Sequence, residues 1–280
     1  MNWDPDFAQR SPLFEPLRAH AAGLGPIWPG LADLQGLLDS SDPPIRNAAG
    51  APLRLAPPAR GKVAALEKYE PRLYLKGELC VRERDWHDLL NVLVWLTFPC
   101  AKAALNARHY AEIRARKAPN RGPVEDALTL FDEGGVIVVS DDDELLALLK
   151  AFRWKDLFWD KRERVRTHMH FHVFGHALYE KALTPFSGIT ARAILLRTPA
   201  EALNLPLDEQ LACVDRHVAA HLADPVRLSG TLDLAPVPVL GVPGWCPDNE
   251  RETYYDDGDH FRNGRTQGPG NSPPSSTPFP

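Results

Sequence analysis

The sequence predicts an α+β fold in which helices pack on a mixed sheet, with an extended N-terminal arm and a disordered C-terminal tail. Three observations favour it. Stretches with helical apolar spacing alternate with short stretches of strand-like alternation. Two pairs of these strand-like stretches are spaced as in β-hairpins. The 280 residues are 44% hydrophobic and 25% charged, which is ordinary for a globular protein with a sizeable core.

The composition divides the chain into three parts. Residues 1–60 form a lead-in rich in Pro, Ala and Gly, which we interpret as either a loosely structured segment or a wrapping arm. Residues 61–263 form a single α+β domain. Residues 264–280, rich in Pro and Ser, cannot pack a core, and we expect them to be disordered.

The first elements are a helix, a hairpin and two further helices. Residues 31–38 show helical spacing, and residues 72–75 and 78–81, joined by Lys76 and Gly77, suggest a short hairpin. Asp85 has the features of an N-cap, with Asp88 in a capping-box position, for a helix over 86–98. Pro99 ends or kinks that helix, and residues 101–117 form the next one.

The second half alternates strands and helices. Residues 127–131 and 136–139, joined by Asp-Glu-Gly-Gly, form the clearest hairpin pattern in the chain. We favour a strand over 165–174, because continuing a helix through Gly175 would cost about 1 kcal/mol. The remaining expected elements are helices over 141–151, 176–183 and 207–222, a strand over 188–196 and a loop-like segment over 228–265. A βαβ crossover is one arrangement of these strands, but the hairpins favour a mixed sheet.

Charge and cysteine usage exclude several classes. The net charge of −5 argues against nucleic-acid binding, although two basic runs are present. The four cysteines are scattered without a Cys-x-x-Cys pair, which favours a reducing cytoplasm over a disulfide framework or a zinc knuckle. Residues 1–6 lack signal-peptide features, and the most apolar stretch, 89–98, is too short to cross a bilayer. We expect a cytoplasmic protein without a membrane partner; its oligomeric state stays open.

Four of the ten histidines fall between residues 168 and 176. As a strand, this segment places His168, His170 and His172 on one face, which is either a site or a solvated face. His176 and Glu180 lie one helical turn apart, a spacing at which the two can share a metal, the carboxylate can orient the imidazole, or both can form a structural pair.

Two predicted helices carry polar residues at helical spacing. His87, Asp88 and Asn91 form a polar corner on the apolar helix after Asp85, which is either functional or a set of caps and structural hydrogen bonds. On the next helix Lys102, Asn106 and His109 share one face, which is either part of a site or solvated.

Acidic and basic residues elsewhere complete the candidates. Asp126 stands at the expected start of a strand, whereas Asp132 and Glu133 fit ordinary turn chemistry. Near the C-terminus, Arg262 either reaches an anionic group from a lid, or the segment anchors the chain end by burying its aromatic residues.

Several of these segments resemble a bacterial family catalogued as domain of unknown function 3025. The resemblance runs from about Leu66 to Arg265, with Leu90 where Phe is expected, and it implies no activity or cofactor. His168, His170 and His172 fall outside it. The matching segments are Trp86–Pro99 with Lys102, Leu105, Asn106 and His109; Asp126–Gly135; Phe174–Leu183 with Pro185 and Gly188–Thr190; and Pro238–Trp245 with Asn249, Tyr254–Asp257, Phe261 and Arg262.

The sequence contains no Gly-x-Ser-x-Gly elbow, P-loop, Gly-x-Gly-x-x-Gly or His-Glu-x-x-His motif, so no motif indicates a particular reaction. The first hypothesis is an enzyme, metal-assisted or not, that acts on a small polar or phosphorylated substrate, such as a hydrolase. The second is a non-enzymatic binding or scaffold protein with a structural polar network. Because no closed ligand set is evident, we expect weak metal binding or none, and the cofactor stays unknown. The enzyme hypothesis takes His87, Asp88, His109, Asp126, His176 and Glu180 as catalytic and Asn91, Lys102, Asn106 and Arg262 as binding a small anionic ligand.

Overall fold

The computed structural model describes residues 2–59, 61, 64–116, 120–264 and 277–278. Its centre is a mixed sheet in the order β4-β3-β5-β6, with β7 beside β5. β3 runs parallel to β5, whereas β4 and β6 are antiparallel to their neighbours, so the predicted mixed sheet is confirmed. The strands are β3 (Gly135–Ser140), β4 (Met169–Val173), β5 (Thr190–Arg197), β6 (Ala235–Pro238) and β7 (Thr277–Pro278).

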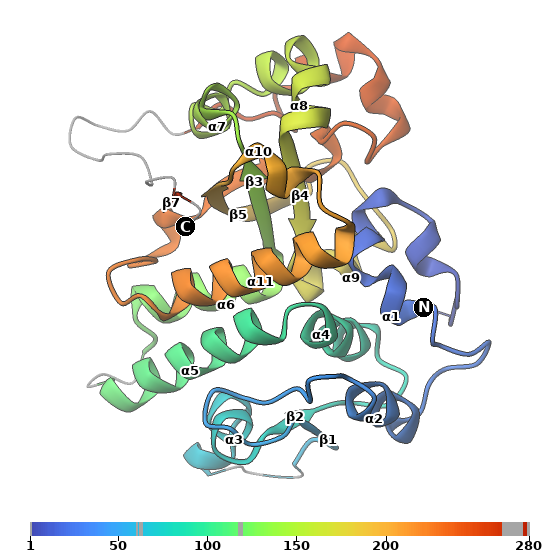
Figure 1. Ribbon diagram of the computed structural model, residues 1–280, viewed down its shortest axis with the longest axis vertical. Coiled ribbons are helices and arrows are strands. Elements are labelled where there is room, and N and C mark those ends of the chain that lie inside the picture. Colours follow the sequence, from blue (N-terminus) through green and yellow to red (C-terminus); the bar gives the residue numbers. More distant parts are fainter. Residues whose placement is uncertain (1, 60, 62–63, 117–119, 265–276, 279–280) are drawn as a thin grey trace.

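Two long helices separate this sheet from a smaller one (Figure 1). α4 (Trp86–Thr97) and α5 (Pro99–Ala115) lie between the large sheet and the parallel pair β1 (Arg54–Ala56) and β2 (Glu78–Cys80). α4 is buried almost all round, as its apolar sequence predicts. Among the described residues no single helix is long and apolar enough to cross a membrane; α4 and α5, bent by 112° at their junction, pass that test only as a pair.

The N-terminal segment wraps the domain and is not loose. It contains short 3₁₀ turns at Phe7–Gln9 and Pro12–Leu17, followed by α1 (Arg18–Ala21) and α2 (Leu31–Asp39). Phe7, Phe14 and Leu17 have no exposed surface. Trp3 and Trp28 pack against Trp86 of α4 with ring centroids 5.2 and 5.1 Å away. Burial of these rings fixes the arm to α4.

Two predicted strands are helices instead. Residues 72–75 belong to α3 (Tyr69–Lys76), which ends at Gly77 with φ 71°. A Cβ there would lie 2.3 Å from the Pro52 carbonyl oxygen, so the close approach requires glycine. Residues 127–131 belong to α6 (Pro123–Gly134), which leads directly into β3. Both predicted hairpins are therefore wrong in their first strand.

The bounds of the remaining elements agree with the predicted bounds to within two residues at each end. The exception is the strand predicted over 165–174, because residues 162–168 are helical and β4 begins only after them. The segment 228–264 contains β6 and several 3₁₀ turns besides loops. The predicted disordered tail lies outside the described residues, apart from Gly264 and β7. The other helices are α7 (Asp143–Lys150), a π-helical turn (Asp156–Asp160), α8 (Arg162–His168), α9 (His176–Ala182), α10 (Ala200–Leu203) and α11 (Leu207–Ala223).

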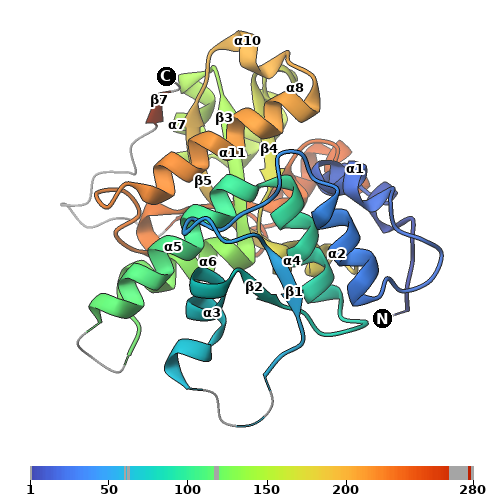
Figure 2. The same ribbon diagram turned by 60° about the horizontal axis from the view of Figure 1, so that its bottom comes forward.

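The helices that form the site are held by capping and packing. Asp85 accepts a hydrogen bond from the Asp88 amide and so begins α4, as predicted. Asp215 of α11 accepts hydrogen bonds from the Cys100 and Ala101 amides and so caps α5, which lies along α11. Figure 2 shows α4, α5 and α6 above the small sheet, with α3 beside that sheet and packed against α5.

Candidate active site

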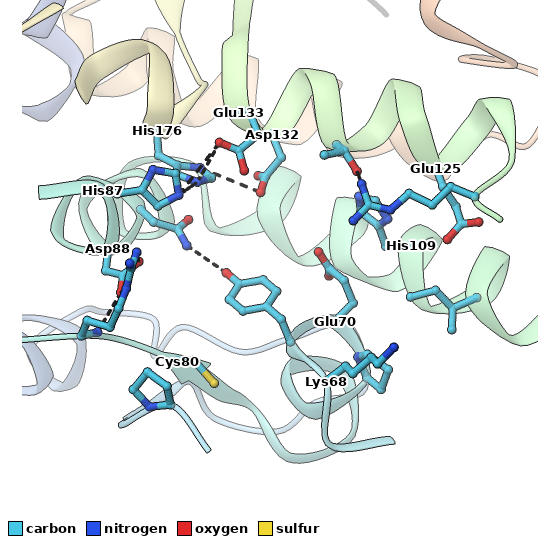
Figure 3. A pocket seen from close by; sticks show the side chains of 18 of the residues that line it. Lys68, Glu70, Cys80, His87, Asp88, His109, Glu125, Asp132, Glu133 and His176 are labelled. Atoms are coloured by element: carbon cyan, nitrogen blue, oxygen red, sulfur yellow. Dashed lines mark hydrogen bonds and ion pairs between the residues drawn. The ribbon is translucent and has the colours of Figure 1, made fainter. Parts of the chain in front are cut away.

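A cavity of about 600 Å³ lies where α3, α4, α5 and α6 meet the start of α9 (Figure 3). Its upper wall carries His87, His176, Asp132 and Glu133, and its lower wall carries the side chains of α3. A volume of this size is typical of small-molecule sites. Five of the candidate residues line this cavity: His87, Asp88, Asn91, His109 and His176.

Two histidines face each other in the upper wall. The His87 Nε2 atom lies 3.0 Å from the His176 Nε2 atom, and the two ring planes meet at 80°. His87 is in the first turn of α4, whereas His176 begins α9. Burial lowers the pKa of His176 to about 3, so this imidazole is neutral at physiological pH. The structure thus brings together two residues that the enzyme hypothesis takes as catalytic.

The absence of a side chain at Gly175 allows His176 to lie against the last turn of α6. A Cβ on Gly175 would lie 2.4 Å from the Glu133 carbonyl oxygen and 2.5 Å from the Gly135 nitrogen. Only glycine allows the backbones to approach this closely. The chain can therefore turn from β4 into α9 directly against the residues that follow Asp132.

Three carboxylates surround the histidine pair. Glu180 Oε2 lies 2.9 Å from His87 Nδ1. Glu133 Oε2 lies 3.6 Å from His176 Nε2 and 3.9 Å from His87 Nε2. Asp132 Oδ2 lies 3.9 Å from His176 Nδ1. The predicted pairing of His176 with Glu180 is therefore wrong: the carboxylate of Glu180 orients His87 from a neighbouring helix.

Asp132 is held by a buried cation. Lys102 forms an ion pair with Asp132, and its Nζ atom also lies 5.8 Å from the ring centres of Trp95 and Phe174. Burial is the largest influence and acts to raise the pKa of Asp132, but the charge and hydrogen bond of Lys102, together with the neighbouring His176 and His109, outweigh it and hold this pKa below its usual value. Lys102 is only 3% exposed, so it stabilises the carboxylate from behind and does not reach into the cavity.

The opposite wall carries a second polar group. Asn106 Nδ2 donates to Glu70 Oε2 at 2.6 Å, and Asn91 Nδ2 donates to the Tyr69 hydroxyl at 2.8 Å. Burial, together with the charge of Asp132, raises the pKa of Glu70 to about 7. The same causes raise the pKa of Tyr69 well above its usual value. Glu70 can therefore exchange a proton near neutral pH.

His109 and Asp88 also line the cavity. His109 is 5% exposed, and burial lowers its pKa to about 4. Asp88 accepts hydrogen bonds from the Arg82 amide and guanidinium at 2.7 to 2.9 Å, which ties the chain before α4 to its first turn. The solvated-face interpretation of Lys102, Asn106 and His109 is wrong, because all three are buried.

Two predicted site residues lie elsewhere. Asp126 is on the first turn of α6, not at a strand start; it is exposed and does not line the cavity. Arg262 is also exposed, and its Nε donates to the Asp259 carbonyl oxygen at 3.0 Å. Tyr255 and Phe261 beside it are buried, which supports the interpretation of this segment as an anchor of the chain end.

The other histidines do not join the site. His168 contacts Asp141 at 3.0 Å, and His170 contacts Gln210 at 2.9 Å. His172 is buried in β4, and burial lowers its pKa to about 3. These three residues therefore form neither a shared site nor a uniformly solvated face.

The basic run after the π-helical turn is neutralised. Each of its cations forms an ion pair with a carboxylate, so it offers no free basic patch. The pairs are Lys161 with Glu144, Arg162 with Glu250, Arg164 with Asp142 and Arg166 with Glu163.

Sequence reasoning missed Tyr69, Glu70, Asp132 and Glu133 as site residues. A usable signal was present for the last two. Once residues 123–134 are recognised as a helix, Asp132 and Glu133 fall in its last turn, where the helix dipole disfavours carboxylates. Acidic residues in such a position indicate a partner, here Lys102 and the histidine pair.

A family model described as "Protein of unknown function (DUF3025)" matches residues 57–265. The chain belongs to this family. The DUF3025 match confirms the resemblance found in the sequence, and its range contains every residue that lines the cavity. Searches of curated proteins and of solved structures found no match.

Proposed function

We propose that this DUF3025 protein is a hydrolytic enzyme that acts on a small polar or phosphorylated substrate in the cavity. The observation that carries the proposal is the meeting of His87 and His176 at 3.0 Å beside the carboxylates of Glu180 and Glu133. Ionisable groups that converge on a cavity are typical of active sites.

In the proposed reaction, a water molecule attacks the substrate and displaces a leaving group. A water held beside the two Nε2 atoms gives its oxygen to a carbonyl carbon or a phosphorus atom, and the bond to the leaving group breaks. Glu70, whose carboxylate points into the cavity (Figure 3), takes the proton that the water loses and gives it to the leaving group. A carboxyl group with a pKa near neutrality can perform both transfers.

The charges that line the cavity support an anionic substrate group. Arg82 is paired with Asp88, and Arg116 is paired with Glu125. Lys68 and Arg121 also line the cavity, and within the described part of the chain neither forms an ion pair. Arg121 donates a hydrogen bond to the Thr129 hydroxyl at 3.4 Å, and its charge also acts on Glu70 and His109. These two cations would attract a carboxylate or phosphate.

The scaffold hypothesis is supported by a different observation. The ion pairs Arg82–Asp88 and Lys102–Asp132 hold elements together and would serve a purely structural network. On that hypothesis, removing His87 or His176 only destabilises the fold. The two hypotheses therefore differ in what these substitutions do to turnover.

Hydrolysis of p-nitrophenyl phosphate, bis(p-nitrophenyl) phosphate and p-nitrophenyl acetate tests the proposal. We expect turnover of at least one ester, with a loss of about 100-fold or more in His87→Ala and His176→Ala, because each removes a group at the reacting centre. His168→Ala is the matched control, since it removes an imidazole that also contacts a carboxylate but lies outside the cavity. Absence of turnover, or equal rates in His176→Ala and His168→Ala, contradicts the proposal.

The location of the protein is a separate prediction. We propose a cytoplasmic location, because all four cysteines are free thiols, as is usual in a reducing compartment.

A further inference from the structure

We propose that His87 Nε2, His176 Nε2 and Glu133 Oε2 bind one divalent transition-metal ion, with Zn²⁺ as the expected occupant. The three ligand atoms lie within 4.8 Å of one another, and no other such group of His, Cys, Asp or Glu occurs within the described ranges. This inference deepens the proposed function, on which only the catalytic role of the metal rests. The binding site can be tested without any enzyme assay.

The distances fit a shared metal. Two nitrogens that each bind a metal at about 2.1 Å lie about 3.0–3.4 Å apart for angles between 90° and the tetrahedral value. The two Nε2 atoms are 3.0 Å apart. Glu133 Oε2 is slightly too distant, at 3.6 and 3.9 Å, but its side chain is 43% exposed and free to move by the remaining few tenths of an ångström.

The hydrogen-bond inventory of the pair also indicates a cation. Two neutral imidazoles carry two N–H groups. The hydrogen bonds of His87 Nδ1 with Glu180 and between the two Nε2 atoms use both of these N–H groups. His176 Nδ1 is then left unprotonated, although the Asp132 carboxylate lies 3.9 Å away. His176 Nδ1 is buried and makes no hydrogen bond of normal geometry to any described residue. A metal between the two Nε2 atoms replaces the hydrogen bond between them. Both N–H groups can then be on the Nδ1 atoms, where each faces a carboxylate.

That arrangement has a second shell suited to a metal. Histidine ligands usually donate their other N–H to a carboxylate, which fixes the tautomer and raises the basicity of the ligand. Glu180 occupies this position behind His87, and Asp132 faces the same position of His176. Lys102 forms an ion pair with Asp132 and holds it in this place. Both histidines can thus present Nε2 to one shared metal.

The site would be open toward the cavity. Its ligands come from three elements, α4, α6 and α9, and His176 is buried while His87 and Glu133 are partly exposed. Three protein ligands leave at least one position for water or substrate, as in catalytic zinc sites. A zinc-bound water loses a proton near neutral pH and would be the nucleophile of the proposed hydrolysis. Imidazole ligands suit zinc and its neighbours and disfavour Mg²⁺.

Calorimetric titration of the EDTA-treated full-length protein with Zn²⁺ tests the site. We expect one equivalent bound by the native chain and by the control His168→Ala, with binding weakened about 100-fold or more in His176→Ala and Glu133→Gln, each of which removes a ligand. In Glu180→Gln, which alters only the second shell, we expect a loss of 10–100-fold. Mg²⁺ should give no heat of binding at the same site.

Specific outcomes overturn the inference. The site is ruled out if the native chain does not bind Zn²⁺, or if Glu133→Gln and His176→Ala bind Zn²⁺ as tightly as the native chain. Because Glu133 is partly exposed, its substitution leaves the fold intact and remains informative even if His176→Ala fails to fold, which circular dichroism would show. Stoichiometric Zn²⁺ without hydrolysis of any ester keeps the metal site and rejects the proposed function. Hydrolysis that survives EDTA in a protein that does not bind Zn²⁺ supports the proposed function and rejects the metal site.

Discussion

His87 and His176 are 89 residues apart in the sequence, yet their Nε2 atoms lie 3.0 Å apart. The contact follows from the packing of α4 against α9 and from the glycine that lets α9 start against α6. Removing solvent from His176 keeps it neutral, and a neutral imidazole is the form that can bind a metal or accept a proton. The fold thus brings the two rings together before any ligand arrives.

The buried pair Lys102–Asp132 should be essential for stability. Lys102→Met leaves Asp132 without its cation in a site that is almost inaccessible to water, and we expect a loss of about 3–5 kcal/mol in the free energy of unfolding. Urea denaturation measures it. The exposed pair Lys76–Glu67 is the control, since Lys76→Met should cost about 1 kcal/mol or less. Similar losses in the two variants would contradict the assignment.

The fold could be predicted from the sequence where local and tertiary signals agree. Asp85 and the apolar run after it predict α4, and the alternation over 188–196 predicts β5. The prediction failed at Ala127–Phe131, where apolar and β-favouring residues suggest a strand. The stronger signal was Pro123 at the first helical position with Glu125 two residues later, whose side chain accepts from the Gly122 amide. Burial of Leu128 and Phe131 on one helix face then decides the structure.

The site could be predicted only in part, because side-chain partners depend on helix packing. His87, His176, Glu180 and His109 carry chemistry that is recognisable in isolation. Glu70 was missed because the residues just after it, 72–75, were predicted as a strand, and its partner Asn106 lies 36 residues away. Asp126 was included because a second error of this kind, over 127–131, placed it at the start of a strand. No spacing rule could have shown that Glu180 faces His87, 93 residues away, and not His176.

Asp215 should stabilise the start of α5. Its carboxylate accepts from two amides at the N-terminus of that helix, so Asp215→Ala leaves both without a partner, and we expect a loss of about 1–3 kcal/mol. Thermal and urea denaturation measure the loss. Asp208→Ala, which removes an exposed carboxylate from the first turn of the same helix α11, should cost less than about 0.5 kcal/mol. Equal effects would show that the cap contributes nothing.

His172 should make the fold sensitive to mild acid. Burial lowers its pKa from 6.5 to about 3, so below pH 6.5 the unfolded chain binds a proton that the folded chain refuses. Its contribution to stability is therefore complete above pH 6.5 and falls as the pH decreases toward 3. When the pH is lowered from 7.5 to 5.5, we expect the free energy of unfolding of His172→Leu to fall by about 1 kcal/mol less than that of the native chain.

Ile137→Val provides the control for His172. Ile137 pairs with His172 across β3 and β4, is equally buried and does not titrate. This substitution should lower stability by about 0.5–1.5 kcal/mol at both pH values alike. If His172→Leu shows the same pH dependence as the native chain, His172 does not contribute to the acid sensitivity.

Glu70 should reduce stability at alkaline pH and support turnover. Its pKa in the folded chain, about 7, lies above the ordinary 4.5, so the stability that the protonated carboxyl contributes is complete below pH 4.5 and is lost as the pH rises to 7. Glu70→Gln stays neutral and should therefore be more stable than the native chain at pH 8, by on the order of 2 kcal/mol, with no difference near pH 4.5. The same variant should hydrolyse a responsive ester about 10²–10⁴ times more slowly, because it cannot accept a proton. Melting temperatures at the two pH values and steady-state rates measure both effects. A variant that is less stable at pH 8 and fully active would instead identify Glu70 as a structural partner of Asn106.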